Sequence, residues 1–259
     1  MQGLCPVLRI DREKAEVVRD PVAEEFQLTI FLNGRELVTL ACSPAHMEYL
    51  ALGFLRSEGF IRGREDVEKV ILDSRNGVVR ITAKGDFDPD APFKRFITSG
   101  CGKGIGYYRV QDAALKEVKA ELKVPPSAIF GLMGEFQKLS KVYRETGGVH
   151  SAALCDTERV LVFEEDIGRH NALDKVFGRC LWEGFSTSGR IVLTTGRVSS
   201  EVVLKVVRMG IPFLASRSAP TDLAVRFAEG LGVTLIGFVR GSRMNVYTHG
   251  ERMLWKTGN

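Results

Sequence analysis

The sequence predicts an α/β protein in which a smaller β-rich part precedes a larger part of alternating helices and strands. Two strand-like runs near the N-terminus are joined by Asn33-Gly34, a dipeptide typical of tight β-hairpins. After Pro125-Pro126, apolar strand-like runs alternate with amphipathic helical ones, which is the order of a sheet covered by helices. The 259 residues, 44% hydrophobic and 26% charged, are enough for two separate cores.

We divide the chain into three parts. Residues 1–97 form a β-rich domain, 98–125 hold a glycine-rich loop and a connecting helix, and 126–259 form the α/β domain. The first domain has strands over 26–32, 36–42, 67–72 and 78–82, the last two meeting near Asn76-Gly77. Between the two pairs a helix carries an apolar stripe, with Ser43 as its N-cap, Pro44 in its first turn and Gly59 at its end.

The elements of the third part follow from periodicity and helix caps. Ser127 is expected to cap a helix whose apolar stripe extends to Tyr143, and Thr221 to cap a later one. The remaining elements are strands over 149–154, 160–163, 191–194, 211–215 and 233–239, and helices from 170 and from 199. Their alternation indicates a largely parallel sheet with helices on both faces.

Polar residues follow three of these strands, over 164–171, 194–197 and 238–243. The C-terminal ends of parallel strands open on one edge of a sheet, where ligands gather. The third run is Phe238, Val239, Arg240, Gly241, Ser242 and Arg243. Its two guanidinium groups beside a Gly-Ser turn could converge on one phosphate, although a solvated basic turn is an equally good reading.

The strongest candidate for reactive chemistry is Cys101, which lies in the run Thr98-Ser99-Gly100-Cys101-Gly102-Lys103-Gly104-Ile105-Gly106. Glycines on both sides leave its sulfur open to another molecule. Lys103 favours the thiolate, which is the nucleophilic form. The alternative is a small residue packed in a tight turn.

The other cysteines have simpler explanations. Cys42, Cys155 and Cys180 lie on predicted strands or helices and are expected to pack in or near the core, whereas Cys5 is near a terminus. Five scattered cysteines favour reduced thiols in the cytoplasm, and none has the spacing of a zinc site. We see no signal peptide and no apolar run long enough to cross a membrane.

The remaining charged groups allow only weak assignments. The net charge of +4 suits an anionic ligand but is too small and dispersed for duplex DNA, so we expect no nucleic-acid partner. His170 and His150 could bind an anion or substrate, although packing is the commoner role. Glu165 and Asp166 could be acid–base groups, although capping the following helix is simpler.

Together with the Cys101 loop, five further segments resemble the FdhD family of formate dehydrogenase accessory sulfurtransferases. They are 146–154, 165–175, 195–201, 218–221 and 237–249, of which 165–175, EDIGRHNALDK, is the most specific. They occur in the family's order over nearly the whole chain.

This resemblance implies a function. Cys101 would take sulfane sulfur from a cysteine desulfurase as a persulfide and pass it to the molybdenum cofactor, in its bis(molybdopterin guanine dinucleotide) form, before insertion into formate dehydrogenase. Phe238 to Arg243 match the family's cofactor-binding segment, and the larger domain would be a cytidine-deaminase-like α/β/α sandwich. Because the cofactor has two nucleotide arms, we also expect a homodimer.

One position departs from the family, because many relatives carry Cys-x-x-Cys where this chain has Gly104. A persulfide needs one sulfur, so the missing thiol affects only release through an internal disulfide. Two other functions remain open: a chaperone that delivers the cofactor without handling sulfur, and a zinc deaminase. The deaminase reading lacks its His-x-Glu and Pro-Cys-x-x-Cys motifs at the matching helix starts.

Overall fold

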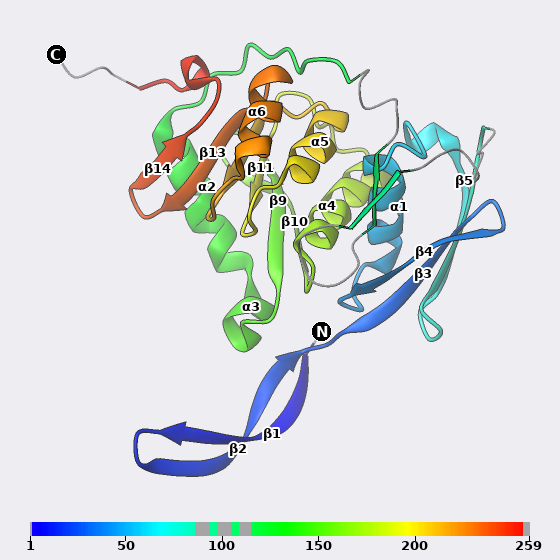
Figure 1. The fold of residues 1–259 in the computed structure, drawn as a ribbon, viewed down its shortest axis with the longest axis vertical. Coiled ribbons are helices and arrows are strands. Elements are labelled where there is room, and N and C mark those ends of the chain that lie inside the picture. The colour runs from blue at the N-terminus through cyan, green and yellow to red at the C-terminus, as the bar shows by residue number, and fades with distance from the viewer. Residues whose placement is uncertain (1, 86–93, 98–104, 109–114, 256–259) are drawn as a thin grey trace.

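The computed structural model describes residues 2–85, 94–97, 105–108 and 115–255, and the fold is mixed α/β with several sheets (Figure 1). The chain begins with a two-stranded antiparallel hairpin, β1 (Gln2–Asp11) and β2 (Lys14–Ala23), which projects away from the body. A second short antiparallel pair is formed by β7 (Lys94–Ile97) and β8 (Ile105–Tyr108).

A four-stranded sheet and one helix form the smaller of the two main units. The strand order is β4-β3-β6-β5, with β3 (Phe26–Leu32), β4 (Arg35–Cys42), β5 (Val67–Asp73) and β6 (Val78–Ala83). The predicted hairpin is confirmed: Asn33 and Gly34 have φ of 50° and 80°, as a tight two-residue turn requires. Helix α1 (Met47–Ser57) and the sheet share one apolar core, and a 3-10 turn (Arg64–Asp66) leads into β5.

The larger unit is built on a six-stranded sheet of order β10-β9-β11-β12-β13-β14. Its strands are β9 (His150–Cys155), β10 (Val160–Asp166), β11 (Ile191–Thr194), β12 (Phe213–Ser216), β13 (Thr234–Arg240) and β14 (Arg243–Val246). Its helices are α2 (Pro126–Leu139), α3 (Lys141–Thr146), α4 (Arg169–Glu183), α5 (Ser200–Arg208) and α6 (Asp222–Gly230), and a 3-10 turn (Gly250–Arg252) follows.

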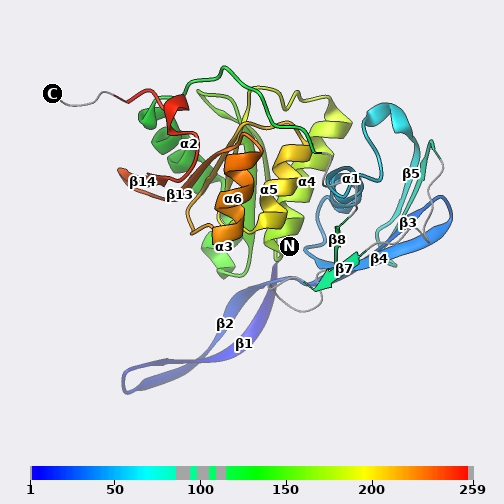
Figure 2. The ribbon, with the colours of Figure 1, turned by 45° about the horizontal axis from the view of Figure 1, so that its top comes forward.

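Helices cover both faces of this sheet, as predicted. Alternate strand residues divide between two cores: Leu154 and Val192 pack with α4, α5 and α6, whereas Ala153 and Leu193 pack with α2. Figure 2 shows α4, α5 and α6 side by side in front of the sheet and α2 behind it. The two main units meet where α1 packs along α4.

The prediction of a largely parallel sheet is wrong, because antiparallel strand pairs outnumber parallel ones in the six-stranded sheet. Only the pairs β11–β12 and β12–β13 are parallel, whereas β9 is antiparallel to both of its neighbours and β14 to β13. The turn between β9 and β10 is held by Asp156, whose Oδ1 accepts the amides of Glu158 and Arg159 at 2.8 Å each. This turn carries no Asn-Gly or Asp-Gly signal, so the hairpin was not foreseen.

Three predicted helix boundaries also need correction. The first helix begins at Met47, because Ser43 is bonded elsewhere: its amide donates to Asp166 and its hydroxyl accepts the amide of Ile167. Helix α2 begins at Pro126, not after a Ser127 cap. Tyr143 does not extend its buried stripe but lies half-exposed on the separate helix α3.

The expected connecting helix is absent from the described part of its range, which starts at residue 115. The chain there is held by backbone bonds to distant segments, from the amide of Val118 to the carbonyl of Leu231 and from the amide of Val124 to that of Arg252, both 2.9 Å. These tertiary bonds replace the local ones that a helix would make.

Candidate functional site

The loops that leave four strands meet at one edge of the six-stranded sheet. Because β10 and β11 both run antiparallel to β9, they point the same way as each other, and β12 and β13 are parallel to β11. The polar runs after β10, β11 and β13 therefore open on the same edge, which confirms the predicted convergence. Helices α4 and α5 begin there too, and we call this region the sheet-edge site.

Hydrogen bonds tie these loops to one another. The Ser216 hydroxyl donates to the Gly196 carbonyl at 2.7 Å, and the amide of Arg217 donates to the Thr194 carbonyl at 3.2 Å. Arg240 Nε donates to the Arg217 carbonyl at 3.2 Å, which joins the loop after β13 to the loop after β12. The loops after β11, β12 and β13 therefore form one bonded unit.

Four buried polar atoms at this edge have no hydrogen-bond partner among the described residues: Arg169 Nε, His170 Nε2, Ser199 Oγ and Arg217 Nε. No other side-chain nitrogen or oxygen in the described parts of the chain is buried in this way. An unpaired buried donor costs about 1–3 kcal/mol, so folded proteins retain few of them without a ligand, ion or water to bind. Guanidinium and hydroxyl groups are donors suited to the oxygens of a phosphate.

His170 is neutral in this environment. Burial and the positive charges of Lys205, Arg169 and His150 lower its pKa to about 3. Its Nε2 lies 3.7 Å from Glu201 Oε2, but a neutral imidazole makes no ion pair with that carboxylate, and burial in turn raises the pKa of Glu201. The His170 imidazole therefore adds no positive charge to the sheet-edge site. The positive charge of this site comes from its arginines.

The starts of two helices add to the positive potential. Gly168 precedes α4 and Ser199 precedes α5, and neither helix has a side-chain cap. In α6, by contrast, the Thr221 hydroxyl accepts the amide of Ala224. The first amides of α4 and α5 are free of side-chain caps, and helix N-termini favour anions. The edge is therefore suited to a negatively charged ligand.

The predicted segment Phe238 to Arg243 lies at this edge, but its residues differ in solvent exposure. Arg240, Gly241, Ser242 and Arg243 are exposed, whereas the Val239 side chain is 1% exposed and packs in the core next to α2. Only the backbone of Val239 could meet a ligand. Phe238 and Gly241 have φ of 53° and 56°, so the turn is sharply bent, and the Arg240 guanidinium lies 5.9 Å from the Phe238 ring centre.

The two carboxylates considered as acid–base groups make structural bonds. Asp166 Oδ2 lies 2.6 Å from the ammonium of Lys175, and both side chains are fully buried. Asp166 Oδ1 accepts the amide of Gly168, the residue before α4, and no amide of the helix itself, so the expected capping of this helix is not observed. Glu165 accepts hydrogen bonds from the hydroxyls of Ser140 and Ser151.

The sequence reasoning did not single out Arg169, Ser199 or Arg217 as ligand-binding residues. The signal for Arg217 was available, because Ser216-Arg217-Ser218 is a fourth polar run at a strand end. His150, whose Nδ1 lies 3.2 Å from Thr195 Oγ1, also belongs to this edge, and burial lowers its pKa.

Cys101, Lys103 and Gly104 lie outside the described residues. The other four cysteines are free thiols: Cys42, Cys155 and Cys180 are buried, as predicted, and Cys5 is exposed. Burial raises the pKa of Cys42 to about 12, so it is an unreactive thiol at neutral pH. Within the described ranges, no helix is both long and apolar enough to cross a membrane, and no cluster of His, Cys, Asp and Glu could hold a metal ion.

The fold and this edge define an α/β protein with a site suited to an anionic ligand. The profile of the FdhD/NarQ family matches residues 23–254, and the chain belongs to this family. It is 44% identical over 250 residues to the sulfur carrier protein FdhD of Bacillus subtilis, covering 95% of each chain. The sulfur carrier protein FdhD of Listeria innocua is 42% identical, with 95% of this chain and 97% of that protein covered.

A solved structure agrees with the fold. The crystal structure of a formate dehydrogenase accessory protein from Desulfotalea psychrophila matches with a TM-score of 0.82 and 28% identity, covering 98% of this chain and 99% of that one.

Proposed function

We propose that this protein is a sulfur carrier that accepts sulfur as a persulfide on Cys101 and transfers it to the molybdenum cofactor before that cofactor enters formate dehydrogenase. Relatives that match along almost the whole chain bear the name sulfur carrier protein, and the solved relative is a formate dehydrogenase accessory protein. The cargo is the bis(molybdopterin guanine dinucleotide) form, which this protein binds as a substrate.

The observation that carries the binding half of this proposal is the set of four unpaired buried polar atoms at the sheet edge. The guanine dinucleotide contains a pyrophosphate, whose oxygens can accept from Arg169, Ser199 and Arg217 while the amides of α4 and α5 face the same charge. Arg240 and Arg243 stand exposed beside them, where they can meet the remaining phosphate or the base.

The sulfur half of the proposal rests on Cys101. Its thiolate attacks the outer sulfur of a persulfide on a cysteine desulfurase, the donor's S–S bond breaks, and the donor leaves as a thiolate. The products are a Cys101 persulfide and a reduced donor cysteine, so no external oxidant is needed. Because Gly104 replaces a second loop thiol, the acceptor itself attacks the outer sulfur of the Cys101 persulfide and supplies the electron pair of the new bond, the S–S bond breaks, and Cys101 leaves as a thiolate.

We also propose a cellular compartment, an oligomeric state and a fold for the larger domain. The four free described cysteines suit the reducing cytoplasm, where a persulfide carrier keeps its thiol available. We propose a homodimer, in which two sheet-edge sites would serve the two nucleotide arms of the cofactor. The larger domain is proposed to share the cytidine-deaminase-like sandwich, with α4 and α5 starting where a deaminase holds its zinc.

Mass spectrometry tests the central step. After incubation with a cysteine desulfurase and cysteine, we expect Cys101 to gain about 32 Da, one sulfur atom. The Cys101→Ala variant should gain nothing, and Cys5→Ala, which removes the exposed described thiol, should behave as the parent protein. If the cofactor received as much sulfur with Cys101→Ala as with the parent protein, Cys101 would not be the sulfur carrier. The protein would then be a chaperone that binds the cofactor without handling sulfur. Stoichiometric zinc in the purified protein would favour the deaminase function.

A further inference from the structure

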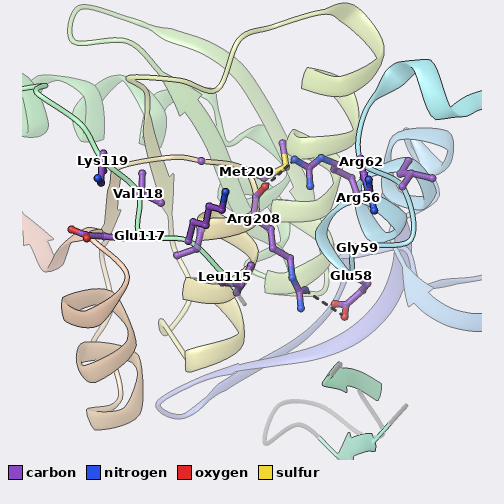
Figure 3. A pocket seen from close by; sticks show the side chains of 14 residues that line it. Arg56, Glu58, Gly59, Arg62, Leu115, Glu117, Val118, Lys119, Arg208 and Met209 are labelled. Carbon is purple, nitrogen blue, oxygen red and sulfur yellow. Dashed lines mark hydrogen bonds and ion pairs between the residues drawn. The ribbon is translucent and has the colours of Figure 1, made fainter. Parts of the chain in front are cut away.

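A second hollow lies away from the sheet-edge site, between the end of α1, the segment 115–119 and the end of α5 (Figure 3). Its volume is about 590 Å³, a size typical of small-molecule sites. Helix α5 starts at the sheet-edge site with Ser200 and ends at Arg208, beside this hollow. Nine helical residues span about 14 Å, so the two sites are at opposite ends of one helix.

The charge of the hollow is positive. Five basic side chains line it, Arg56, Arg62, Lys116, Lys119 and Arg208, against two acidic ones, Glu58 and Glu117. One of the acids is already engaged, because Glu58 Oε1 lies 3.1 Å from Lys205 Nζ. The side chains of Arg62, Lys116 and Lys119 make no hydrogen bond or ion pair with the described residues. Three cations are therefore available to a ligand.

Two of the basic groups are held close together despite their like charge. Arg56 Nη2 donates to the Arg208 carbonyl at 2.9 Å, and Arg208 in turn donates to the carbonyl of Ser57. Burial and the nearby charge of Arg208 lower the pKa of Arg56. The fold thus fixes two guanidinium groups at the wall of the hollow, where Glu58 Oε2 lies 4.0 Å from Arg208 Nη1 and offsets part of their charge.

The negative end of α5 does not cancel this charge. The carbonyls of Arg208 and Met209 accept hydrogen bonds from Arg56 and from the Thr187 hydroxyl, so these free ends of the helix are satisfied. The other wall is also fixed, because the Val118 amide is bonded to the Leu231 carbonyl. The cations are therefore presented from walls that are already held in place.

The hollow also has apolar lining, from Ile61, Leu115, Val118, Val207 and Met209. A cationic rim with apolar walls suits a small molecule that carries phosphate groups on an organic body. We propose that this hollow binds a phosphate-bearing small molecule, independently of the cargo at the sheet edge. Lys116, Lys119 and Arg62 contact its phosphates, and the apolar side chains contact its organic part.

Calorimetry with two probes, inorganic pyrophosphate and ADP, tests this site. The measurements use the Arg217→Ala variant, in which the sheet-edge site is weakened, so that the remaining heat reports the hollow. We expect binding there and a Kd at least about tenfold higher after Lys116→Glu and Lys119→Glu together, because both cations are lost and two negative charges replace them. ADP should bind more tightly than pyrophosphate if the apolar walls contact its nucleoside.

The matched control reverses two exposed lysines outside the hollow, Lys69→Glu and Lys123→Glu, and should leave both affinities unchanged. No heat from either probe, or equal weakening by the control pair, would overturn the site. Equal affinity for the two probes would overturn the proposed contact between the apolar walls and the organic part of the ligand, and would leave the proposed phosphate contacts in place. Failure of the cargo proposal would appear differently, as unchanged GDP binding in Arg217→Ala.

Discussion

Gly53 of α1 and Gly178 of α4 lie against each other where the two helices cross. A Cβ on Gly53 would stand 2.8 Å from the Gly178 amide nitrogen, and one on Gly178 would stand 2.7 Å from the Gly53 nitrogen. Neither distance is allowed for a real side chain, and the obstructing atoms are backbone. The contact between the smaller unit and the α/β unit thus depends on two positions without side chains.

We therefore expect Gly53→Ala to destabilise the protein by a few kcal/mol, because the helices must move apart and lose buried contacts. The free energy of unfolding from urea titration measures this. Gly131→Ala is the control: it lies in α2 with open space around its Cβ position, so alanine should stabilise by about 0.5–1 kcal/mol through helix propensity. Equal effects of the two changes would contradict the crossing argument.

The buried pair of Lys175 and Asp166 gives a second stability prediction. Lys175 Nζ also donates to the carbonyls of Ser43 and Glu165, so the ammonium joins the turn before α1 to the end of β10. Lys175→Met should cost about 3–5 kcal/mol, since it leaves a buried carboxylate without its partner. Adding Asp166→Asn should recover part of the loss, whereas Lys138→Met, at an exposed position, should change little.

Local sequence signals were sufficient for the two hairpins of the smaller unit and for most helices, but not for the β9–β10 hairpin or for distant bonds. The Asn33-Gly34 turn and the Thr221 cap depend on neighbouring residues and were predicted correctly. Ser43 has the same local signature as a cap, yet it bonds to Asp166 and Ile167, more than a hundred residues away. Sequence spacing carries no information on such a partner.

The position of the sheet-edge site could be predicted from the sequence, but not all of the residues that form it. Strand direction alone brings the three polar runs together, so their convergence could be deduced. The unpaired atoms of Arg169, Ser199 and Arg217 depend on which side chains the fold buries without a partner, and this requires coordinates. Val239 shows the converse, because its place in the segment gave no sign that its side chain faces the core.

Binding of GDP, as a fragment of the proposed cargo, should depend on Arg217. We expect Arg217→Ala to raise the Kd by at least about tenfold, because it removes a buried charged donor. The exposed Arg243→Ala should also weaken binding, but less, since water screens its charge. Calorimetry measures both, with Arg226→Ala as control because that guanidinium pairs with Asp222 on α6. Unchanged affinity in Arg217→Ala would exclude it from the site.

The imidazole of His170, which is 22% exposed, should make stability depend on pH. Its pKa is about 3 in the folded protein and near 6.5 in the unfolded chain, so between these values only the unfolded chain binds the proton. The contribution of His170 is complete above pH 6.5 and falls as the pH drops toward 3, by up to about 1.4 kcal/mol per pH unit. His170→Gln should flatten this fall in urea titrations at several pH values.

His46 provides a control of opposite sign. Its hydrogen bond to Glu164 raises its pKa above 6.5, so its contribution is complete below pH 6.5 and is lost as the pH rises through the folded-state pKa. His46→Asn, an amide that tolerates the left-handed backbone at this position, should therefore remove stability at low pH and spare it at high pH. If both variants changed the pH profile in the same direction, the assignment of a neutral His170 would be wrong.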